Sequence, residues 1–323
     1  MKKIPPPLII LLLALGLGVA AAAAVFIGPT HSMGANILLR IRLPRVFLGM
    51  LVGFALALAG ALFQGLLKNP LADPYVLGTS SGAALGALVA FELRALFPQW
   101  VGYSTFSFYI LVFGAAFLAT NASYLIARTE SQVQIVSLLL SGVMVNSFCG
   151  ALLMLFFSLQ NRDSFSIFFF FLGSLIEGNW GLILTSSAIV AAGFVAALFL
   201  ARRLDIVSLG EEKAAHLGVD VGRLKLAVFA LGSLIVSAAV AVSGTIGFVG
   251  LVAPHVTRLL IGPKHKYLLP ASGLVGAMMM VVTDAAARTV ASPIEIPVGV
   301  ICAMLGAPFF LWLLRRKKKE NYF

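Results

Sequence analysis

The sequence is poor in charged residues, and in acidic residues above all. Only 11% of its 323 residues are Asp, Glu, Lys or Arg, and the 12 acidic residues are outnumbered by 23 basic ones. Soluble domains carry roughly 25% charged and about 45–50% apolar residues, whereas this chain is 60% hydrophobic with a mean hydropathy of +1.03. This composition excludes a soluble globular fold and predicts an integral membrane protein.

Cysteine and catalytic motifs are equally scarce. Cys149 and Cys302 are the two cysteines, and both fall within apolar runs, which favours small buried side chains over a disulfide or a metal pair. The sequence has no Gly-x-x-x-x-Gly-Lys-Ser/Thr phosphate-binding loop, no His-Glu-x-x-His and no Cys-x-x-Cys, and its four histidines are scattered. We therefore expect no enzymatic activity, no metal site and no cofactor bound by this chain.

Long apolar runs dominate what is present. A helix needs roughly 20 apolar residues to cross the hydrocarbon core of a bilayer, and strict period-2 alternation, which would indicate an outer-membrane barrel, is absent. The predicted fold class is therefore all-α integral membrane, a polytopic bundle of about ten transmembrane helices forming a single domain over residues 1–323. The predicted spans lie near residues 8–27, 46–66, 76–92, 104–127, 133–157, 180–201, 226–243, 246–260, 268–290 and 297–314.

The placement of basic residues predicts the orientation of the chain. Lys2 and Lys3 precede the first run and five basic residues, Arg315 to Lys319, follow the last, so both termini are expected in the cytoplasm. With ten spans, seventeen of the 23 basic residues fall on that side. The net charge of +11 then reflects topology, and we expect no nucleic-acid partner. A secretory signal is the alternative for the first run, with Ala20 to Ala24 as cleavage residues.

A basic cluster on the opposite side does not follow this rule. Arg40, Arg42 and Arg45 lie just before the second span and are expected to face outward. Because guanidinium groups suit carboxylates, one interpretation is a docking site for an acidic partner surface. The alternative is that these arginines contact lipid headgroups or cap neighbouring loops.

The longest polar stretch, residues 202–225, is expected to face the cytoplasm. Within it, residues 210–218 predict a short helix that is ended by a glycine, Gly218. So structured a loop indicates a handle for a partner protein, and a solvated connector is the alternative. A second cytoplasmic linker carries Pro70 and Pro74, which predict a rigid turn that is either a gate or a hairpin corner.

Asp284 is the one carboxylate that is a fair candidate for an ion-coupling group inside a span. Arg288 follows one helical turn later, and an ion pair between the two is the preferred interpretation. The alternative function is an ion-coupled secondary transporter that uses Asp284 and Arg288.

Several short motifs occur in order along almost the whole chain. They are Arg42-Leu43-Pro44-Arg45, Asn69-Pro70-Leu71-Ala72-Asp73-Pro74 with Leu77-Gly78 and Ser81-Gly82-Ala83, Leu209-Gly210-Glu211 with Ala214 and Leu217-Gly218, Gly244-x-Ile246-Gly247-Phe248-Val249-Gly250-Leu251-Val252-x-Pro254-His255, Leu268-Leu269-Pro270, and Ile296-Pro297-Val298-Gly299-Val300 with Leu305-Gly306-Ala307-Pro308-Phe309. Together they resemble the FecCD-type permeases, the ABC importer subunits for iron-siderophores, haem and vitamin B12.

This resemblance implies a type II ABC importer permease of ten spans in the bacterial or archaeal inner (plasma) membrane. It implies a homodimer, or a heterodimer with a related permease, in contact with membrane lipid. The implied partners are two ATP-binding cassette subunits inside, which would bind ATP and Mg²⁺, and a periplasmic or lipid-anchored substrate-binding protein outside. Iron-siderophore is the first expectation for the cargo, then haem, then vitamin B12, because the vitamin B12 member has small polar residues where this chain has Ile135 and Val136. Oxyanions such as molybdate are a further alternative.

The resemblance also assigns roles to particular residues. Arg42, Arg45 and Arg288 match the outward arginines that receive acidic residues of the binding protein, and Asn69 and Leu71 fall at the cytoplasmic gate. The loop of residues 209–218, within the polar stretch 202–225, looks like the coupling helices that contact the ATPase. Its predicted coupling residues are Leu209, Gly210, Glu211, Glu212, Ala214, Ala215, His216, Leu217 and Gly218.

Overall fold

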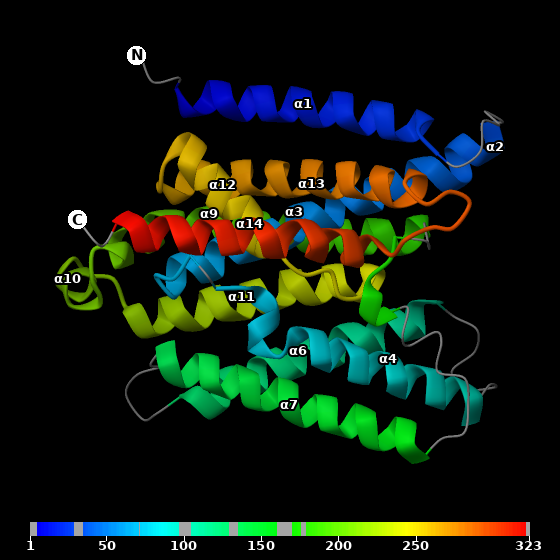
Figure 1. The fold of residues 1–323 in the computed structure, drawn as a ribbon. Coiled ribbons are helices and arrows are strands. Elements are labelled where there is room, and N and C mark those ends of the chain that lie inside the picture. The colour runs from blue at the N-terminus through cyan, green and yellow to red at the C-terminus, as the bar shows by residue number, and fades with distance from the viewer. Residues whose placement is uncertain are drawn as a thin grey trace.

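The described part of the chain is helical and forms one bundle (Figure 1). The structure is a computed structural model that describes residues 5–28, 35–70, 72–96, 105–128, 135–159, 170–175 and 179–320. Its principal helices are α1 (Pro6–Phe26), α3 (Leu43–Leu66), α4 (Thr79–Leu96), α6 (Thr105–Ala127), α7 (Ile135–Leu159), α9 (Trp180–Ser208), α11 (Val221–Ser243), α12 (Val249–Ile261), α13 (His265–Thr289) and α14 (Val298–Glu320). These ten helices coincide with the ten predicted spans.

Seven of the described helices are long and apolar enough to cross a membrane: α1, α3 with the preceding turn, α6, α7, α9, α11 and α13. The apolar parts of α4, α12 and α14 are shorter. The 13 residues of α12 span about 20 Å, less than the roughly 30 Å of a hydrocarbon core. The protein is thus a multi-pass, all-α membrane protein in which one helix covers only part of the bilayer.

Both labelled chain ends lie at the same end of the bundle (Figure 1). The short helix α10 (Glu211–His216) lies at that end as well, and α2 (Ala35–Ile37) lies at the other. The chain therefore crosses the bundle an even number of times. The predicted partner-binding loop lies at the end that carries the termini, and the arginine cluster lies at the far end.

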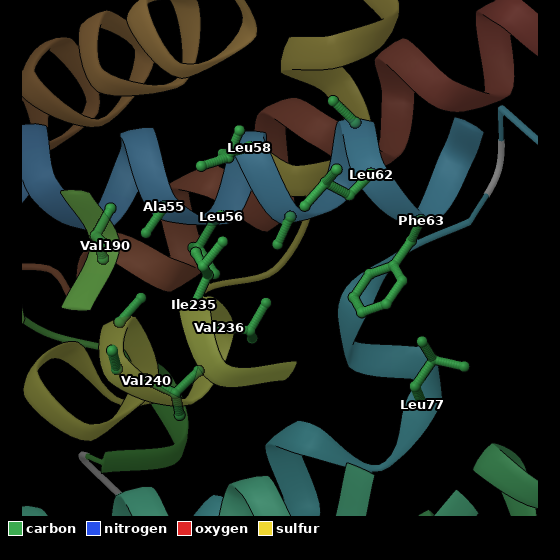
Figure 2. Close-up of a cluster of buried hydrophobic side chains, with 14 of the residues drawn as sticks. Ala55, Leu56, Leu58, Leu62, Phe63, Leu77, Val190, Ile235, Val236 and Val240 are labelled. Atoms are coloured by element: carbon green, nitrogen blue, oxygen red, sulfur yellow. The ribbon is translucent and has the colours of Figure 1, made fainter. Parts of the chain in front are cut away.

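Helix α3 forms the centre of the bundle. It packs against α9, α11, α12 and α13, and most of its side chains are buried. The buried cluster around it includes Leu58, Leu62 and Phe63 on α3 and Ile235 on α11 (Figure 2). Phe63 also packs against Phe229 with ring centroids 5.5 Å apart. A helix this apolar on all sides is buried among its neighbours and leaves the outer helices to face lipid.

Glycines let α3 approach two neighbours closely. A Cβ atom at Gly53 would overlap the backbone carbonyl of Gly276 on α13, and one at Gly60 would overlap the carbonyl of Gly250 on α12. Without a hydrophobic driving force inside the bilayer, such close backbone contact is a main source of helix association. These two crossings fix α12 and α13 against α3.

Two segments that are not α-helical interrupt the bundle. A 3-10 turn, η2 (Pro74–Leu77), lies between α3 and α4, and residues 244–248 separate α11 from α12. The break lies at Gly244 to Phe248, whereas α12 continues through Pro254. Phe248 adopts a left-handed conformation with φ of 68°, which costs energy for a residue with a side chain.

The polar stretch 202–225 contains more helix than predicted. Helix α9 continues through Arg202 and Arg203 to Ser208, and α11 begins at Val221. The prediction ended this span at residue 201 because Arg202 and Arg203 are charged. A long helix can, however, extend beyond the membrane with its charged turns in water. The irregular parts of the stretch are residues 209–210 and 217–220.

Candidate functional site

The first candidate site is the α10 segment, residues 209–218. Gly210 precedes the helix with φ of 125° and Gly218 follows it with φ of 80°, conformations that favour glycine. Glu211 and Glu212 occupy the first turn and Lys213 and His216 the last, the arrangement that the helix dipole favours. The predicted short helix ended by a glycine is confirmed.

One side of α10 is anchored to the bundle. Ala214 is fully buried, and its carbonyl accepts a hydrogen bond of 3.0 Å from the backbone N–H of Val219. Glu211 accepts a hydrogen bond from Nζ of Lys225 on α11 at 2.8 Å. These contacts hold α10 in a fixed position relative to α9 and α11.

The other side of α10 is exposed and partly apolar. Leu209 and Leu217 flank the helix and are 62% and 63% exposed. Glu212, Lys213, Ala215 and His216 are exposed between them. Because this segment lies at the end of the bundle, its two leucines lie outside the apolar belt of the long helices. Leu209 and Leu217 thus place exposed apolar area at both ends of an otherwise polar, fixed helix.

The second predicted site is the linker between α3 and α4. Asn69 is half-buried, and its carbonyl accepts a hydrogen bond from the N–H of Ala72 at 3.1 Å. Leu71, the other predicted gate residue, lies outside the described residues. Asp73 caps the following turn by accepting from the N–H of Tyr75 at 2.9 Å. Burial raises the pKa of the Asp73 carboxyl.

The hydrogen bonds that hold η2 to α7 and to residues 244–248 were not predicted from the sequence. Asn146 on α7 donates to the carbonyls of Tyr75 and Val76 at 3.0 and 3.2 Å. The hydroxyl of Tyr75 accepts a hydrogen bond of 3.1 Å from the N–H of Ile246 in the second broken segment. Asparagine in the middle of a predicted span was the available signal, since polar side chains inside a bilayer satisfy backbone groups that have left a helix.

The third predicted site is the arginine cluster at the opposite end. Arg42 is 5% exposed, and its Nη1 donates to the carbonyls of Val25 and Phe26 at 3.3 and 3.2 Å. Arg288 is 2% exposed and donates to the carbonyls of Ala24 and Ile27. The two guanidinium groups thus satisfy the last carbonyls of α1, which has no basic residue in its own last turn.

Arg45 connects two carboxylates. Its Nε lies 2.9 Å from Oδ1 of Asp284 and its Nη1 lies 2.8 Å from Oε2 of Glu295. Arg288 contacts the same Asp284 through Oδ2 at 3.0 Å, so the predicted ion pair between Asp284 and Arg288 is confirmed. Glu295 lies in the loop between Pro293 and Pro297, and its pairing with Arg45 was not predicted because 250 positions separate the two residues.

These contacts bear on the two interpretations of the cluster. Arg42 and Arg288 cap the end of α1, which agrees with the alternative to docking. Of Arg40, Arg42 and Arg45, which precede the second span, Arg40 is the exposed one. Docking of an acidic partner by Arg42, Arg45 and Arg288 stays a prediction. Among the described residues, no group of three or more His, Cys, Asp or Glu could hold a metal ion.

The comparison with known families decides the identity. The model of the FecCD transport family matches residues 7–316. The chain belongs to the FecCD transport family. Its relatives include the ABC transporter permease YvrB of Bacillus subtilis, whose function is uncharacterised, at 44% identity over 91% of this chain and 82% of that protein. The haemin transport permease HmuU of Yersinia pestis is 40% identical over 88% and 85% of the two chains.

Two further comparisons extend this membership. The cobalamin import permease BtuC of Halobacterium salinarum is 40% identical over 86% of this chain and 73% of that protein. A solved inward-facing transporter of the metal-chelate ABC type is 32% identical, covers 96% of this chain and 99% of its own, and superposes with a TM-score of 0.84. The FecCD chain therefore has the fold of an ABC permease subunit, a translocation component. No finding supports the ion-coupled alternative.

Proposed function

We propose that this FecCD protein is the translocation subunit of an ABC importer for a metal chelate. It works as a homodimer in the bacterial or archaeal inner membrane, with both termini and α10 in the cytoplasm. Two ATP-binding cassette subunits bind ATP and Mg²⁺ and contact α10, and a substrate-binding protein delivers the chelate at the far end.

The surface of α10 carries this proposal. A fixed helix with exposed Leu209 and Leu217, and with Glu212 between them, supplies the apolar and charged groups that a groove in a partner protein can bury. Such a contact lets a rearrangement in the partner displace the ends of α9 and α11. The excess of basic residues near the termini supports a cytoplasmic position for this surface.

Asn69 and Leu71 remain the proposed gate residues, because their linker joins α3, at the centre of the bundle, to the bound turn η2. Arg42, Arg45 and Arg288 remain the proposed docking residues at the far end. For Arg45, docking of an acidic partner requires that the partner's carboxylate replace or extend the contact with Glu295.

For the cargo, we propose an iron-siderophore first, followed by haem and then vitamin B12. Relatives at 40% identity are named for haemin and for cobalamin, and relatives at 33–36% are named for iron citrate and iron hydroxamate. All of these are metal chelates, so the class of cargo is better supported than the individual compound.

The test is transport by the permease reconstituted with its ATPase and binding protein in liposomes. Uptake of ⁵⁵Fe-siderophore, haemin and cobalamin is measured with ATP, with a non-hydrolysable ATP analogue and with a proton gradient alone. We expect uptake of one chelate only when ATP is hydrolysed. Uptake by the permease alone down a proton gradient would sink the proposal, and the Asp284→Asn variant would then show whether that carboxylate carries the ion.

A further inference from the structure

The start of α13 is capped by a residue of another helix. Its own N-cap residue, Lys264, makes no side-chain capping bond. Instead Oδ1 of Asp205, on α9, accepts a hydrogen bond of 2.9 Å from the backbone N–H of His265. The same oxygen lies 2.6 Å from Nδ1 of the His265 ring. An anion at a helix N-terminus with two donors is a strong attachment, and it joins α9 to α13.

The other side of the His265 ring contacts α3. His265 is 4% exposed, and a Cβ atom at Gly65 would overlap its Nε2. This Nε2 is buried and has no hydrogen-bond partner within the described ranges. The ring therefore packs directly on the backbone of α3, one residue before that helix ends at Leu66, and the linker that contains Asn69 follows.

Three helix ends thus meet at one histidine. Asp205 lies four residues before Leu209, where the exposed α10 segment begins. His265 begins α13, and Gly65 lies four residues before Asn69. A displacement of the end of α9 moves the carboxylate of Asp205. The carboxylate holds the His265 ring through one hydrogen bond and the His265 backbone through another, and the ring abuts a glycine that leaves it no room.

From this arrangement we propose that Asp205 and His265 form the mechanical link that passes movement of α10 to the linker between α3 and α4. The inference rests on the proposed function, because it takes α10 as the contact with the ATPase. Both residues are positioning residues: they touch neither cargo nor nucleotide. The link requires the charge of Asp205, which holds the ring, and the ring of His265, which reaches Gly65.

The chain contains a matched control on the other side of α10. Asp220 also caps a helix, accepting from the backbone N–H of Arg223 at 3.0 Å, and also pairs with a basic side chain, Nε of Arg223 at 3.0 Å. Its contacts stay within the first turn of α11, whereas those of Asp205 cross from α9 to α13. If capping alone mattered, loss of either charge would have the same effect.

The experiment follows the linker without any cargo. A single cysteine replaces exposed Lys68 in a chain whose buried Cys149 and Cys302 are changed to Ser. The permease is assembled with its ATPase subunits, and the rate of modification by a membrane-impermeant maleimide is measured with and without vanadate-trapped nucleotide. We expect the two rates to differ in this parent protein, and their ratio to fall to unity in Asp205→Asn and in His265→Asn.

Two further variants keep the result specific. Asp205→Glu retains the charge and Asp220→Asn retains the link, so we expect both to keep the ratio of the parent protein. Asn at position 205 still accepts from the backbone N–H of His265, and unchanged thermal unfolding confirms that the bundle is intact. A parent-like ratio in Asp205→Asn overturns the link, as does a ratio of unity in the parent.

A variant of α10 separates the two proposals. If Glu212→Lys abolishes the nucleotide response but Asp205→Asn and His265→Asn do not, α10 is the ATPase contact and the link is wrong. If Glu212→Lys and Leu217→Ser both leave the ratio at its parent value, the role of α10 fails, and the link falls with it.

Discussion

Arg45 and Asp284 form an ion pair of 2.9 Å between Nε and Oδ1, although 239 positions separate them in the sequence. The carboxylate is also 3.0 Å from Nε of Arg288. Asp284 therefore lies between two guanidinium groups, one from α3 and one from its own helix.

Removal of Arg45 should destabilise the protein. Arg45→Met leaves the buried Asp284 carboxylate paired with Arg288 alone and removes the contact of Arg45 with the more exposed Glu295. An uncompensated buried charge costs about 3–5 kcal/mol, so we expect a smaller loss here, because Arg288 still compensates Asp284. Thermal unfolding in detergent measures the loss. Asp284→Asn in the Arg45→Met background should recover part of it, and the exposed Arg40→Met is the control. Equal stability of Arg40→Met and Arg45→Met would contradict the assignment.

Charge reversal should separate docking from folding within the cluster. Arg40→Glu changes an exposed side chain, so we expect normal folding and weaker capture of a binding protein with an acidic surface, most clearly at low salt. Arg42→Glu places a carboxylate against the carbonyls of Val25 and Phe26, so we expect a lower melting temperature. Binding is measured by surface plasmon resonance at two salt concentrations; unaltered capture by Arg40→Glu would remove it from the docking surface.

A methyl group at the crossing of α3 and α13 should be costly. In Gly53→Ala the new Cβ overlaps the carbonyl of Gly276, and overpacking typically costs about 1–3 kcal/mol. Gly114→Ala, on α6, meets no atom within 4 Å and should be neutral or stabilising, since alanine favours helix over glycine by up to about 1 kcal/mol. A comparison of melting temperatures tests the contrast, which an equal effect of the two changes would refute.

Loss of the Tyr75 hydroxyl should weaken the contact between η2 and residues 244–248. Tyr75→Phe removes the acceptor of the Ile246 N–H, and an unsatisfied buried donor costs about 1–3 kcal/mol. Tyr109→Phe is the control, because the Ser186 hydroxyl that donates to Tyr109 can rotate to another acceptor. Hydrogen exchange at Ile246 should be faster in Tyr75→Phe alone; identical exchange in both variants would show that the bond is dispensable.

Polar substitutions beside α10 should weaken ATPase binding without unfolding the bundle. We expect the double change Leu209→Ser and Leu217→Ser to weaken co-purification of the ATPase subunits, because both side chains are more than half exposed and gain nothing from the bundle. Arg223→Ser, an exposed change on the first turn of α11 and outside the α10 segment, is the control. Undiminished co-purification of the double variant would place the ATPase contact elsewhere.

The membrane helices were predictable because their signal is local. A run of apolar residues such as 180–201 identifies a span without knowledge of its neighbours, and Asp284 and Arg288 are predictable partners because one helical turn separates them. The glycine that ends α10 is equally local. By contrast, Arg202 and Arg203 were placed in a loop because charge alone does not distinguish a loop from the exposed end of a helix.

The burial of the arginines could not be predicted, since it depends on partners far away in sequence. Arg42 and Arg288 donate hydrogen bonds to carbonyls at the end of α1, and Arg45 donates to Glu295 in the loop before α14. Asp205 and His265 are likewise separated by 60 positions in the sequence. Single-sequence reasoning identifies such residues as exceptional, and only the tertiary packing shows which group each one meets.

The arginine contacts at the end of the bundle opposite α10 also change the electric field there. Arg45, Arg288, Asp284 and Glu295 together carry no net charge, and within the group each cation lies about 3 Å from an anion. The field of such a neutral set falls off more steeply with distance than that of a single cation. The long-range attraction that this end exerts on a negatively charged body is therefore weaker than a count of its arginines implies.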